Sequence, residues 1–168
     1  MELEEVIKNR FSCRKFSDKV VEKEKLNKIL EAGRLAPTAK NNQPIKIYVI
    51  QSEEAISKLD KGTICRYGAK TVLLICGDKE KAFQDGEYSS YEMDASIVTT
   101  HMMLEATNLG VDNIWIRLFD GDILRKEFDI PSNFIPVCLL PIGYKIEECI
   151  PSRLHETRKN IDEIVKFI

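Results

Sequence analysis

The segment from Met93 to Leu109 places the strongest constraint on how this chain can fold. It has no formally charged residue between Asp94 and Glu105, and its pattern predicts a helix whose apolar residues cover most of its circumference. A helix that is apolar nearly all round is buried on nearly all sides. In a chain of 168 residues, this requires either a sheet on one side and a second subunit on the other, or a fully covered core.

The other periodic segments alternate between helical and strand patterns. Helices are predicted over Leu3–Lys8, Val21–Leu35 and Glu53–Leu59, and from a cap at Asp120 to Phe128. Strands are predicted over Ile45–Ile50, Thr71–Cys76, Asn113–Leu118 and Val137–Ile142, with a turn at Gly77-Asp78. The type of the last segment, Ile161–Ile168, stays open. We therefore expect one α+β domain over residues 1–168, without a linker or repeat.

Composition excludes several classes of protein. Hydrophobic residues make up 43% of the chain, which is enough to build a core and is not typical of disorder. Lys+Arg number 25 and Asp+Glu 27, a net charge of −2, so we expect no nucleic-acid or anionic-membrane partner. No apolar run approaches the roughly 18 residues that a membrane span needs.

The cysteines and histidines are not spaced as metal ligands. The five cysteines include no C-x-x-C pair, and the two histidines, His101 and His155, are isolated, so no metal site is expected. We interpret His101 as a hydrogen-bonded core residue and His155 as solvated. Unpaired thiols fit a reducing compartment, and a terminus charged from its second residue is not typical of a signal peptide, so a cytoplasmic location is expected.

The first candidate site is Arg10-Phe11-Ser12-Cys13-Arg14. In an extended segment, residues 10, 12 and 14 point to the same side. Two guanidinium groups beside a hydroxyl are suited to a phosphate group. The alternative is a solvated basic patch on a loop.

Two further segments carry polar or aromatic groups that could meet a ligand. Ala36–Pro44 concentrates amide and hydroxyl side chains between a helix and a strand, and amides can pair with the polar edge of a planar heterocycle. An ordinary turn is the alternative, since Asn, Thr and Pro favour turns. In Gly110–Leu118, Trp115 is by default a core residue, and Arg117 needs a partner or solvent.

Taken together, these segments resemble the FMN-dependent nitroreductase family. Three motifs carry the resemblance, in the family's order: Arg10-x-Ser12-x-Arg14; Ala36-Pro37-Thr38-x-x-Asn41-x-Gln43-Pro44; and Asp94 with the apolar helix, Leu109-Gly110 and Trp115-Ile116. The stretch from Arg158 to Val165 is similar to the basic residue and terminal strand that close the family's chains. The resemblance covers nearly the whole chain.

The resemblance implies a three-layer α-β-α sandwich with a central mixed, mainly antiparallel sheet, and a homodimer with FMN at the subunit interface. It implies that Arg10, Ser12, Arg14 and Arg158 hold the phosphate end, and that Pro37 and Thr38 reach the flavin from the partner subunit. The implied cofactor-binding residues are Arg10, Phe11, Ser12, Arg14, Pro37, Thr38, Asn41, Gln43, Trp115, Ile116, Arg117 and Arg158.

The implied activity is an oxidoreductase in which NAD(P)H passes hydride to flavin N5, and a nitroaromatic, quinone or similar small acceptor takes two electrons in a ping-pong sequence. The cofactor carries the bond-making, so no side chain is assigned as catalytic. A flavin-binding protein without turnover, and other flavin chemistry on the same fold such as reductive dehalogenation, remain alternatives. Arg117, Ile45 and the short segment Gly77–Met93 depart from the family pattern, which affects the expected substrate more than the cofactor.

Overall fold

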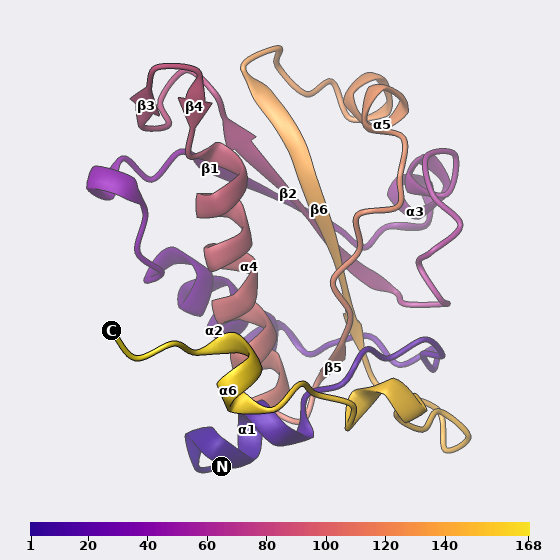
Figure 1. Cartoon of the computed structure of the whole chain (residues 1–168). Coiled ribbons are helices and arrows are strands. Elements are labelled where there is room, and N and C mark those ends of the chain that lie inside the picture. The colour runs from indigo at the N-terminus through magenta and orange to yellow at the C-terminus, as the bar shows by residue number, and fades with distance from the viewer.

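The computed structural model describes residues 1–168 and is built on a four-stranded antiparallel sheet in the order β1-β2-β6-β5 (Figure 1). The strands are β1 (Ile45–Ile50), β2 (Thr71–Asp78), β6 (Phe134–Gly143) and β5 (Asp112–Asn113). β2 and β6 form the centre of the sheet, and nearly all of their residues are buried. Continuous apolar runs of this kind are typical of strands covered on both faces.

Two long helices cover one face of the sheet. They are α2 (Lys23–Arg34) and α4 (Tyr91–Asn108), and their apolar residues form one core cluster with Leu73, Ile75 and Leu140 of the sheet. They approach closely at Gly33, where an added Cβ would lie 2.8 Å from Cγ of Met102. A side chain at Gly33 would therefore push the two helices apart.

Two short helices cover the opposite face. α3 (Glu53–Leu59) begins at Ser52, whose side chain accepts a hydrogen bond from the Ala55 amide. α5 (Gly121–Glu127) begins at Asp120, whose carboxylate accepts from two amides of the first turn, as the sequence predicts. Helices thus lie on both sides of the sheet (Figure 1), and the expected three-layer α+β sandwich is confirmed.

The N-terminal segment adds the one parallel element. After α1 (Leu3–Asn9), Ser12 forms a parallel bridge with Asn113 of β5, and the amide of Cys13 donates to the Asn113 carbonyl at 3.1 Å. The sheet is therefore mainly antiparallel with a parallel contact at its edge. This contact fixes the backbone of residues 10–14, which we call the basic motif, against the edge of the sheet.

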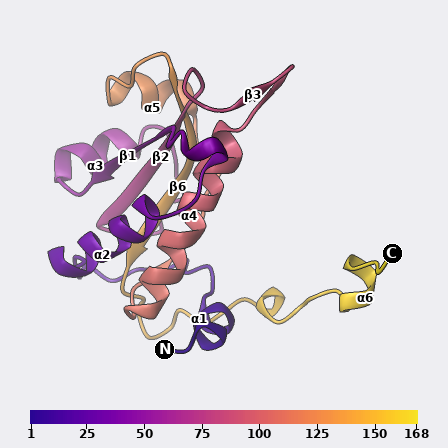
Figure 2. The same cartoon turned by 90° about the vertical axis from the view of Figure 1, so that its left-hand side faces the viewer.

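Three strand predictions differ from the structure, and one of them is β6, which begins before and ends after the predicted Val137–Ile142. Gly77 and Asp78 continue β2 instead of turning, because they pair with Ile135 and Phe134 of β6. The strand expected over Asn113–Leu118 is shorter: β5 covers Asp112–Asn113, and beyond it only the isolated bridge of Ile116 with Leu139 remains. The short stretch before α4 holds a hairpin of β3 (Gln84–Asp85) and β4 (Tyr88–Ser89), which projects from the body in Figure 2.

The C-terminal part of the chain leaves the body of the protein. Figure 2 shows the segment after η2 (Arg153–His155) running outward to α6 (Ile161–Ile164). A capping box at Asn160 starts this helix, so the segment that resembles a terminal strand is helical here. We call residues 157–168 the C-terminal arm. All hydrogen bonds of the arm are to residues 153–165. No helix of the protein has the length and apolar character that a membrane span requires.

Candidate functional site

A basic pocket lies where the N-terminal motif meets the segment that follows β6. It has a volume of about 180 Å³. Its lining residues are Arg10, Phe11, Ser12, Arg14, Ser152, Leu154, His155 and Arg158. The sequence-predicted residues Arg10, Phe11, Ser12, Arg14 and Arg158 are therefore brought together, although Arg158 is far from the others in the chain.

The charges of this pocket are not neutralised by carboxylates. None of the seven ion pairs of the structure includes Arg10, Arg14 or Arg158. Burial, and in second place the Arg158 cation, lowers the pKa of Arg10 from its usual value. Two like charges near each other favour an anion between them, because an anion removes their repulsion.

The local backbone explains which side chains face the pocket. Cys13 is buried under the sheet edge, whereas Ser12 and Arg14 on either side of it are half-buried and exposed. This is the period-two alternation that the sequence predicts. Arg14 Nη1 donates to the Ser12 carbonyl at 3.4 Å, which orients that guanidinium along the motif.

His155 also belongs to this pocket. It is half-buried rather than solvated: Nε2 lies 3.1 Å from the Lys8 carbonyl, and its ring meets Phe11 edge-on at 6.4 Å between centroids. The other histidine also differs from expectation. His101 is exposed on α4, and its Nδ1 lies 2.9 Å from the Ile97 carbonyl.

The second candidate segment forms a bent loop between α2 and β1. It contains the single turn η1 (Ala39–Asn41), and three of its non-glycine residues have positive φ angles: Lys40 at 51°, Asn41 at 55° and Gln43 at 50°. Backbone of this kind costs roughly 1–3 kcal/mol per residue and persists only where the surroundings hold it. An ordinary turn does not need three such residues, so contacts with the rest of the protein must hold this loop in shape.

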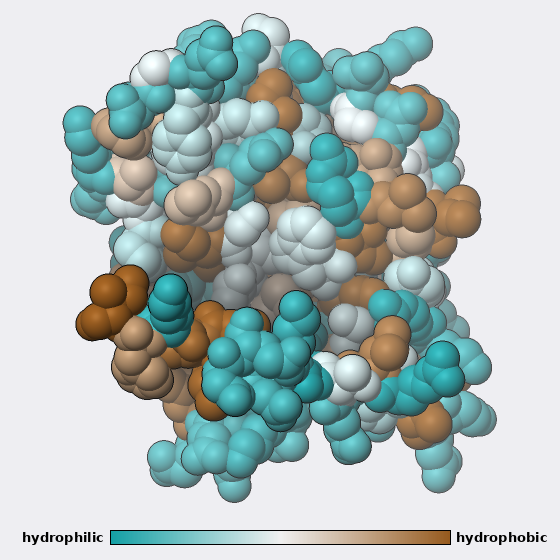
Figure 3. All heavy atoms as spheres, in the orientation of Figure 1, coloured by the Kyte–Doolittle hydropathy of each residue, from teal (hydrophilic) through white to brown (hydrophobic).

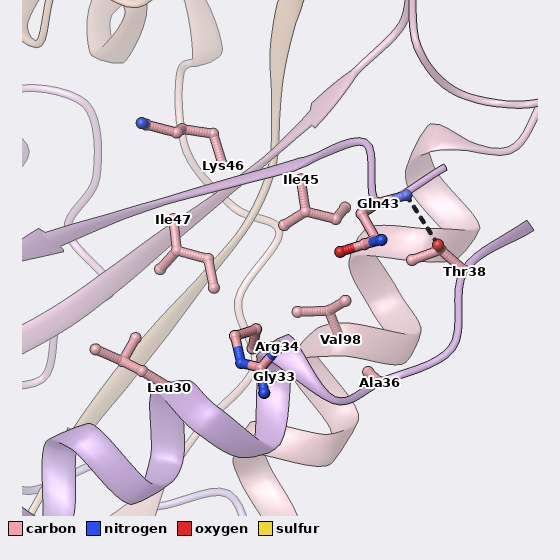
Figure 4. Close-up of a pocket in the computed structure, with 10 residues that line it drawn as sticks. All are labelled: Leu30, Gly33, Arg34, Ala36, Thr38, Gln43, Ile45, Lys46, Ile47 and Val98. Carbon is pink, nitrogen blue, oxygen red and sulfur yellow. Dashed lines mark hydrogen bonds between the residues drawn. The ribbon is translucent and has the colours of Figure 1, made fainter. Parts of the chain in front are cut away.

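Thr38 holds the end of this loop. The Gln43 amide donates to Thr38 Oγ1 at 3.0 Å, shown by the dashed line in Figure 4. Below the loop, a groove of about 300 Å³ runs between α2, β1 and α4, with Leu30, Ile47 and Val98 among its apolar walls (Figure 4). Thr38 and Gln43 thus form the polar end of an otherwise largely apolar groove. Pro37 and Asn41 lie in the same loop and are exposed.

The third candidate segment follows β5. Ile116 is buried and bridges Leu139, so Trp115 and Arg117 project to the other side. Trp115 is 37% exposed and is therefore not the core residue that a tryptophan on a strand is by default. The Arg117 guanidinium lies 5.0 Å from the Phe119 ring centroid and forms no ion pair. Burial raises the pKa of Tyr91 and the Arg117 cation opposes that rise, which places Arg117 near the start of α4.

The basic pocket and the loop are at opposite ends of α4. The loop contacts Asp94 in the first turn, because the Ala39 amide donates to its carboxylate. The basic motif is bridged to Asn113, whose amide donates to Thr107 Oγ1 near the other end. The rise of an α-helix puts about 20 Å between these two positions. One chain therefore does not bring the two sets of predicted residues together.

Comparison with known proteins decides the family. The sequence matches the model of the nitroreductase family over residues 7–66 and 66–144. The chain belongs to the nitroreductase family. The family, the fold and the enzyme class expected from the sequence, an oxidoreductase, are thereby confirmed.

Individual relatives agree with this assignment. A nitroreductase family protein from Clostridium difficile 630 is 42% identical, with a TM-score of 0.92, and the match covers 99% of this chain and 98% of that one. An FMN reductase (NAD(P)H) of Bacillus subtilis is 34% identical over 99% of this chain and 79% of its own length. A protein from Exiguobacterium sibiricum in complex with FMN shares the fold, with 23% identity, a TM-score of 0.86 and coverage of 100% and 98%.

This nitroreductase family member pairs two of its buried thiols, since Sγ of Cys13 lies 3.6 Å from Sγ of Cys149. It contains no group of three or more His, Cys, Asp or Glu residues that could hold a metal ion. The buried thiols of Cys13 and Cys76 have their pKa values raised by burial to about 12. Neither thiol is ionised near neutral pH, so neither is suited to nucleophilic chemistry. The groups that remain available for chemistry are donors and cations, which bind and orient.

Proposed function

We propose that this nitroreductase binds FMN and uses NAD(P)H to reduce a small acceptor such as a nitroaromatic or a quinone. The observation that carries the proposal is the basic pocket: Arg10, Arg14 and Arg158 converge without a carboxylate partner, and the segment that carries Arg10 and Arg14 is bridged to the sheet at Ser12. Such a pocket suits a phosphate group, because guanidinium groups donate paired, charge-assisted hydrogen bonds to phosphate oxygens. The name of the B. subtilis relative, an FMN reductase, and the FMN complex of the E. sibiricum protein support the cofactor.

Bound FMN would supply hydride acceptance at N5 and transfer of two electrons to the second substrate at the same place. The protein's own residues bind and orient. Arg10, Ser12, Arg14 and Arg158 hold the phosphate end, and His155 and Phe11 close one wall of that pocket.

The flavin end is assigned to the two other segments. Trp115, Ile116 and Arg117 continue from Asn113, beside the basic motif, toward the start of α4, so they follow the direction that a bound flavin would take. The exposed Arg117 cation would stabilise negative charge on a reduced ring, as preorganised positive groups do.

The loop that carries Pro37, Thr38, Asn41 and Gln43 contacts the flavin held by the partner subunit. Within one chain it lies about 20 Å from the basic pocket by helical rise. A cofactor held by Arg10 therefore meets this loop most directly in a dimer.

Two features support the homodimer. Met93, Ile97 and Leu104 lie on the outward side of α4 and are only partly covered by their own chain. In Figure 3 the middle of this face is pale to brown, while hydrophilic residues dominate its upper and lower margins. The C-terminal arm carries exposed apolar side chains, among them Ile161, Ile164 and Phe167, the last 94% exposed. Apolar surface of this extent is typical of a face that another subunit covers.

We place the dimer in the cytoplasm. All five cysteines are free and buried, which fits a reducing compartment, and no nucleic-acid or membrane partner is proposed.

The test is a visible absorbance spectrum of protein that has been mixed with FMN and separated from the excess, followed by anaerobic addition of NADH and NADPH. We expect retained flavin absorbance that bleaches on reduction and returns when a quinone or nitroaromatic is added. Retained flavin that does not bleach would replace the proposal with a flavin-binding role. Loss of all flavin would show that the fold is kept without the cofactor site.

A further inference from the structure

We propose that Asp94 is a positioning residue for the cofactor site, a buried carboxylate that locks the loop Pro37–Gln43 in the conformation that meets the flavin ring. The proposal rests on the function proposed above and adds a residue to which no role in that site has been given so far.

Asp94 is the buried acid nearest to the loop, and both of its oxygens are used. Asp94 is only 2% exposed to solvent. Oδ1 accepts the Ala39 amide at 2.9 Å, and Oδ2 accepts the Ser90 hydroxyl at 2.7 Å. It forms no ion pair. Burial of a carboxylate without a cation is costly, so the two hydrogen bonds are what makes this position tolerable.

Local needs of the helix do not explain this carboxylate. Asp94 lies in the first turn of α4, where a negative charge suits the helix dipole. An exposed acid would serve that purpose equally well, and Glu92 in the same turn is exposed. The carboxylate instead reaches the amide of a residue 55 positions away in the chain. One oxygen therefore binds the loop, while the other accepts from Ser90, the cap residue of its own helix.

The contact falls directly before the strained part of the loop. Ala39 precedes Lys40 and Asn41, two of the residues with positive φ, and Gln43 is the third. Asp94 fixes the entry to this stretch through Ala39, and Thr38 Oγ1 fixes its end through the Gln43 amide. Residues in this backbone region relax unless they are held, so removal of the entry contact releases the loop.

The same carboxylate joins the loop to the hairpin that precedes α4. Ser90, which donates to Asp94, also accepts the Phe83 amide at 3.1 Å. Lys40 Nζ lies 4.5 Å from the Phe83 ring centroid, so the loop and the hairpin segment touch a second time. Asp94 thus sets the position of the loop relative to the segment next to it.

The experiment compares Asp94→Ala and Asp94→Asn with the wild type in two measurements. The first is the dissociation constant of the full-length protein for FMN and for riboflavin, which lacks the phosphate. The second is the hydrogen-exchange rate of the Ala39 amide in flavin-free protein. Asp120→Ala is the matched control, because it also removes a carboxylate that accepts two hydrogen bonds, in this case both from backbone amides, on the opposite face of the sheet.

For Asp94→Ala we expect affinity for FMN and for riboflavin to fall by the same factor, about tenfold, as for loss of one hydrogen bond to a charged group. Ala39 should lose its protection from exchange. Asp94→Asn keeps an oxygen for the Ala39 amide, so it should restore most of both properties. Asp120→Ala should change neither, even where it lowers the melting temperature.

Unchanged exchange at Ala39 in Asp94→Ala, or a loss of FMN affinity without an equal loss for riboflavin, would overturn the proposal. If Asp94→Ala does not fold, Asp94→Ser, whose short hydroxyl does not reach Ala39, is judged by the same two measurements. Failure of the proposed function is separate: wild-type protein would bind neither flavin, while the exchange measurement would still report whether Asp94 locks the loop.

Discussion

The basic pocket and the loop Pro37–Gln43 are built on opposite principles. In the pocket, the backbone is ordinary and the proposed phosphate binding depends on side-chain charge: three arginines on or beside an extended segment. In the loop, the side chains are neutral apart from Lys40, and the proposed flavin contact depends on backbone shape, held by Asp94 and Thr38. A site that depends on charge can be predicted from a sequence, because its residue types are recognisable. A site that depends on backbone shape is harder to predict, because its shape comes from contacts between positions that are distant in the chain.

The largest effect on FMN binding is expected from removal of the C-terminal arm, because the pocket and the loop meet at one flavin only in the proposed dimer. Ending the chain at Asn160 removes Ile161, Ile164 and Phe167, and each large apolar side chain buried in a dimer contributes roughly 1.5–3 kcal/mol. We expect a marked shift toward monomer in sedimentation equilibrium and loss of bound FMN. Lys166→Ala, in the same arm, is the control and should leave both unchanged. A truncated protein that stays dimeric and keeps FMN would separate the arm from the site.

Arg10→Ala should show whether the pocket binds through charge, because it should weaken binding of FMN and leave binding of riboflavin unchanged. Loss of a charge-assisted contact costs about 1.5–3 kcal/mol, so FMN affinity should fall roughly 10- to 150-fold. Riboflavin affinity should stay as it is, because riboflavin lacks the phosphate. Isothermal titration with both flavins makes the measurement, with Arg125→Ala on the opposite face as control. An equal loss for both flavins would move Arg10 away from the phosphate.

Thr38→Val should weaken binding of FMN and riboflavin equally, in contrast to Arg10→Ala, and the loss of affinity should be smaller. It removes the oxygen that accepts the Gln43 amide and keeps the shape of the side chain. The cost of about 0.5–1.5 kcal/mol should appear equally in FMN and riboflavin affinity. Thr38→Ser keeps the hydroxyl and should bind both flavins as the wild type does. A Thr38→Val protein with normal riboflavin affinity would show that the shape of the loop does not matter to the ring.

The smallest effect is expected at Cys13, which lies inside the basic motif but is buried. Burial raises the pKa of its thiol to about 12, so the thiol stays protonated at neutral pH, and Cys13→Ser should retain FMN and turnover. The raised pKa also makes the stability of the protein depend on pH. Cysteines of the unfolded chain ionise above about pH 8.5, so the free energy of unfolding should hold below that pH and fall as pH rises toward 12. Urea unfolding at pH 8 and 9.5 measures this, and Cys13→Ser should show the smaller decrease. Loss of turnover in Cys13→Ser with FMN retained would instead point to thiol chemistry.

Elements with strong periodicity could be predicted from the sequence alone. β1 and α3 have the predicted bounds, and α4 differs from its prediction by two residues at its start and one at its end. Weak or edge elements were harder to predict. β5 is shorter than its apolar pattern suggests, because beyond Asn113 only one bridge to β6 forms. Periodicity reports burial well, but it does not report which edge residues find a hydrogen-bond partner.

The candidate site divides in the same way. Arg10, Ser12 and Arg14 could be named from their types and spacing, whereas Phe11 and Arg158 could be named only through the resemblance; the structure brings these five residues together. Asp94 could be noticed only as part of a resemblance, since its partner Ala39 contributes a backbone amide and no recognisable side chain. His155 was expected to be solvated, because its contact with the Lys8 carbonyl depends on the fold of the segment after β6.

The separation of the pocket and the loop along α4 has a genetic consequence. In the proposed dimer, each site takes its pocket from one chain and its loop from the other. A dimer of one Arg10→Ala chain and one Asp94→Ala chain would therefore carry one site with both defects and one site with neither. Mixed dimers formed by co-expression would therefore keep one of their two sites at wild-type FMN affinity, whereas two copies of the same variant would weaken both sites.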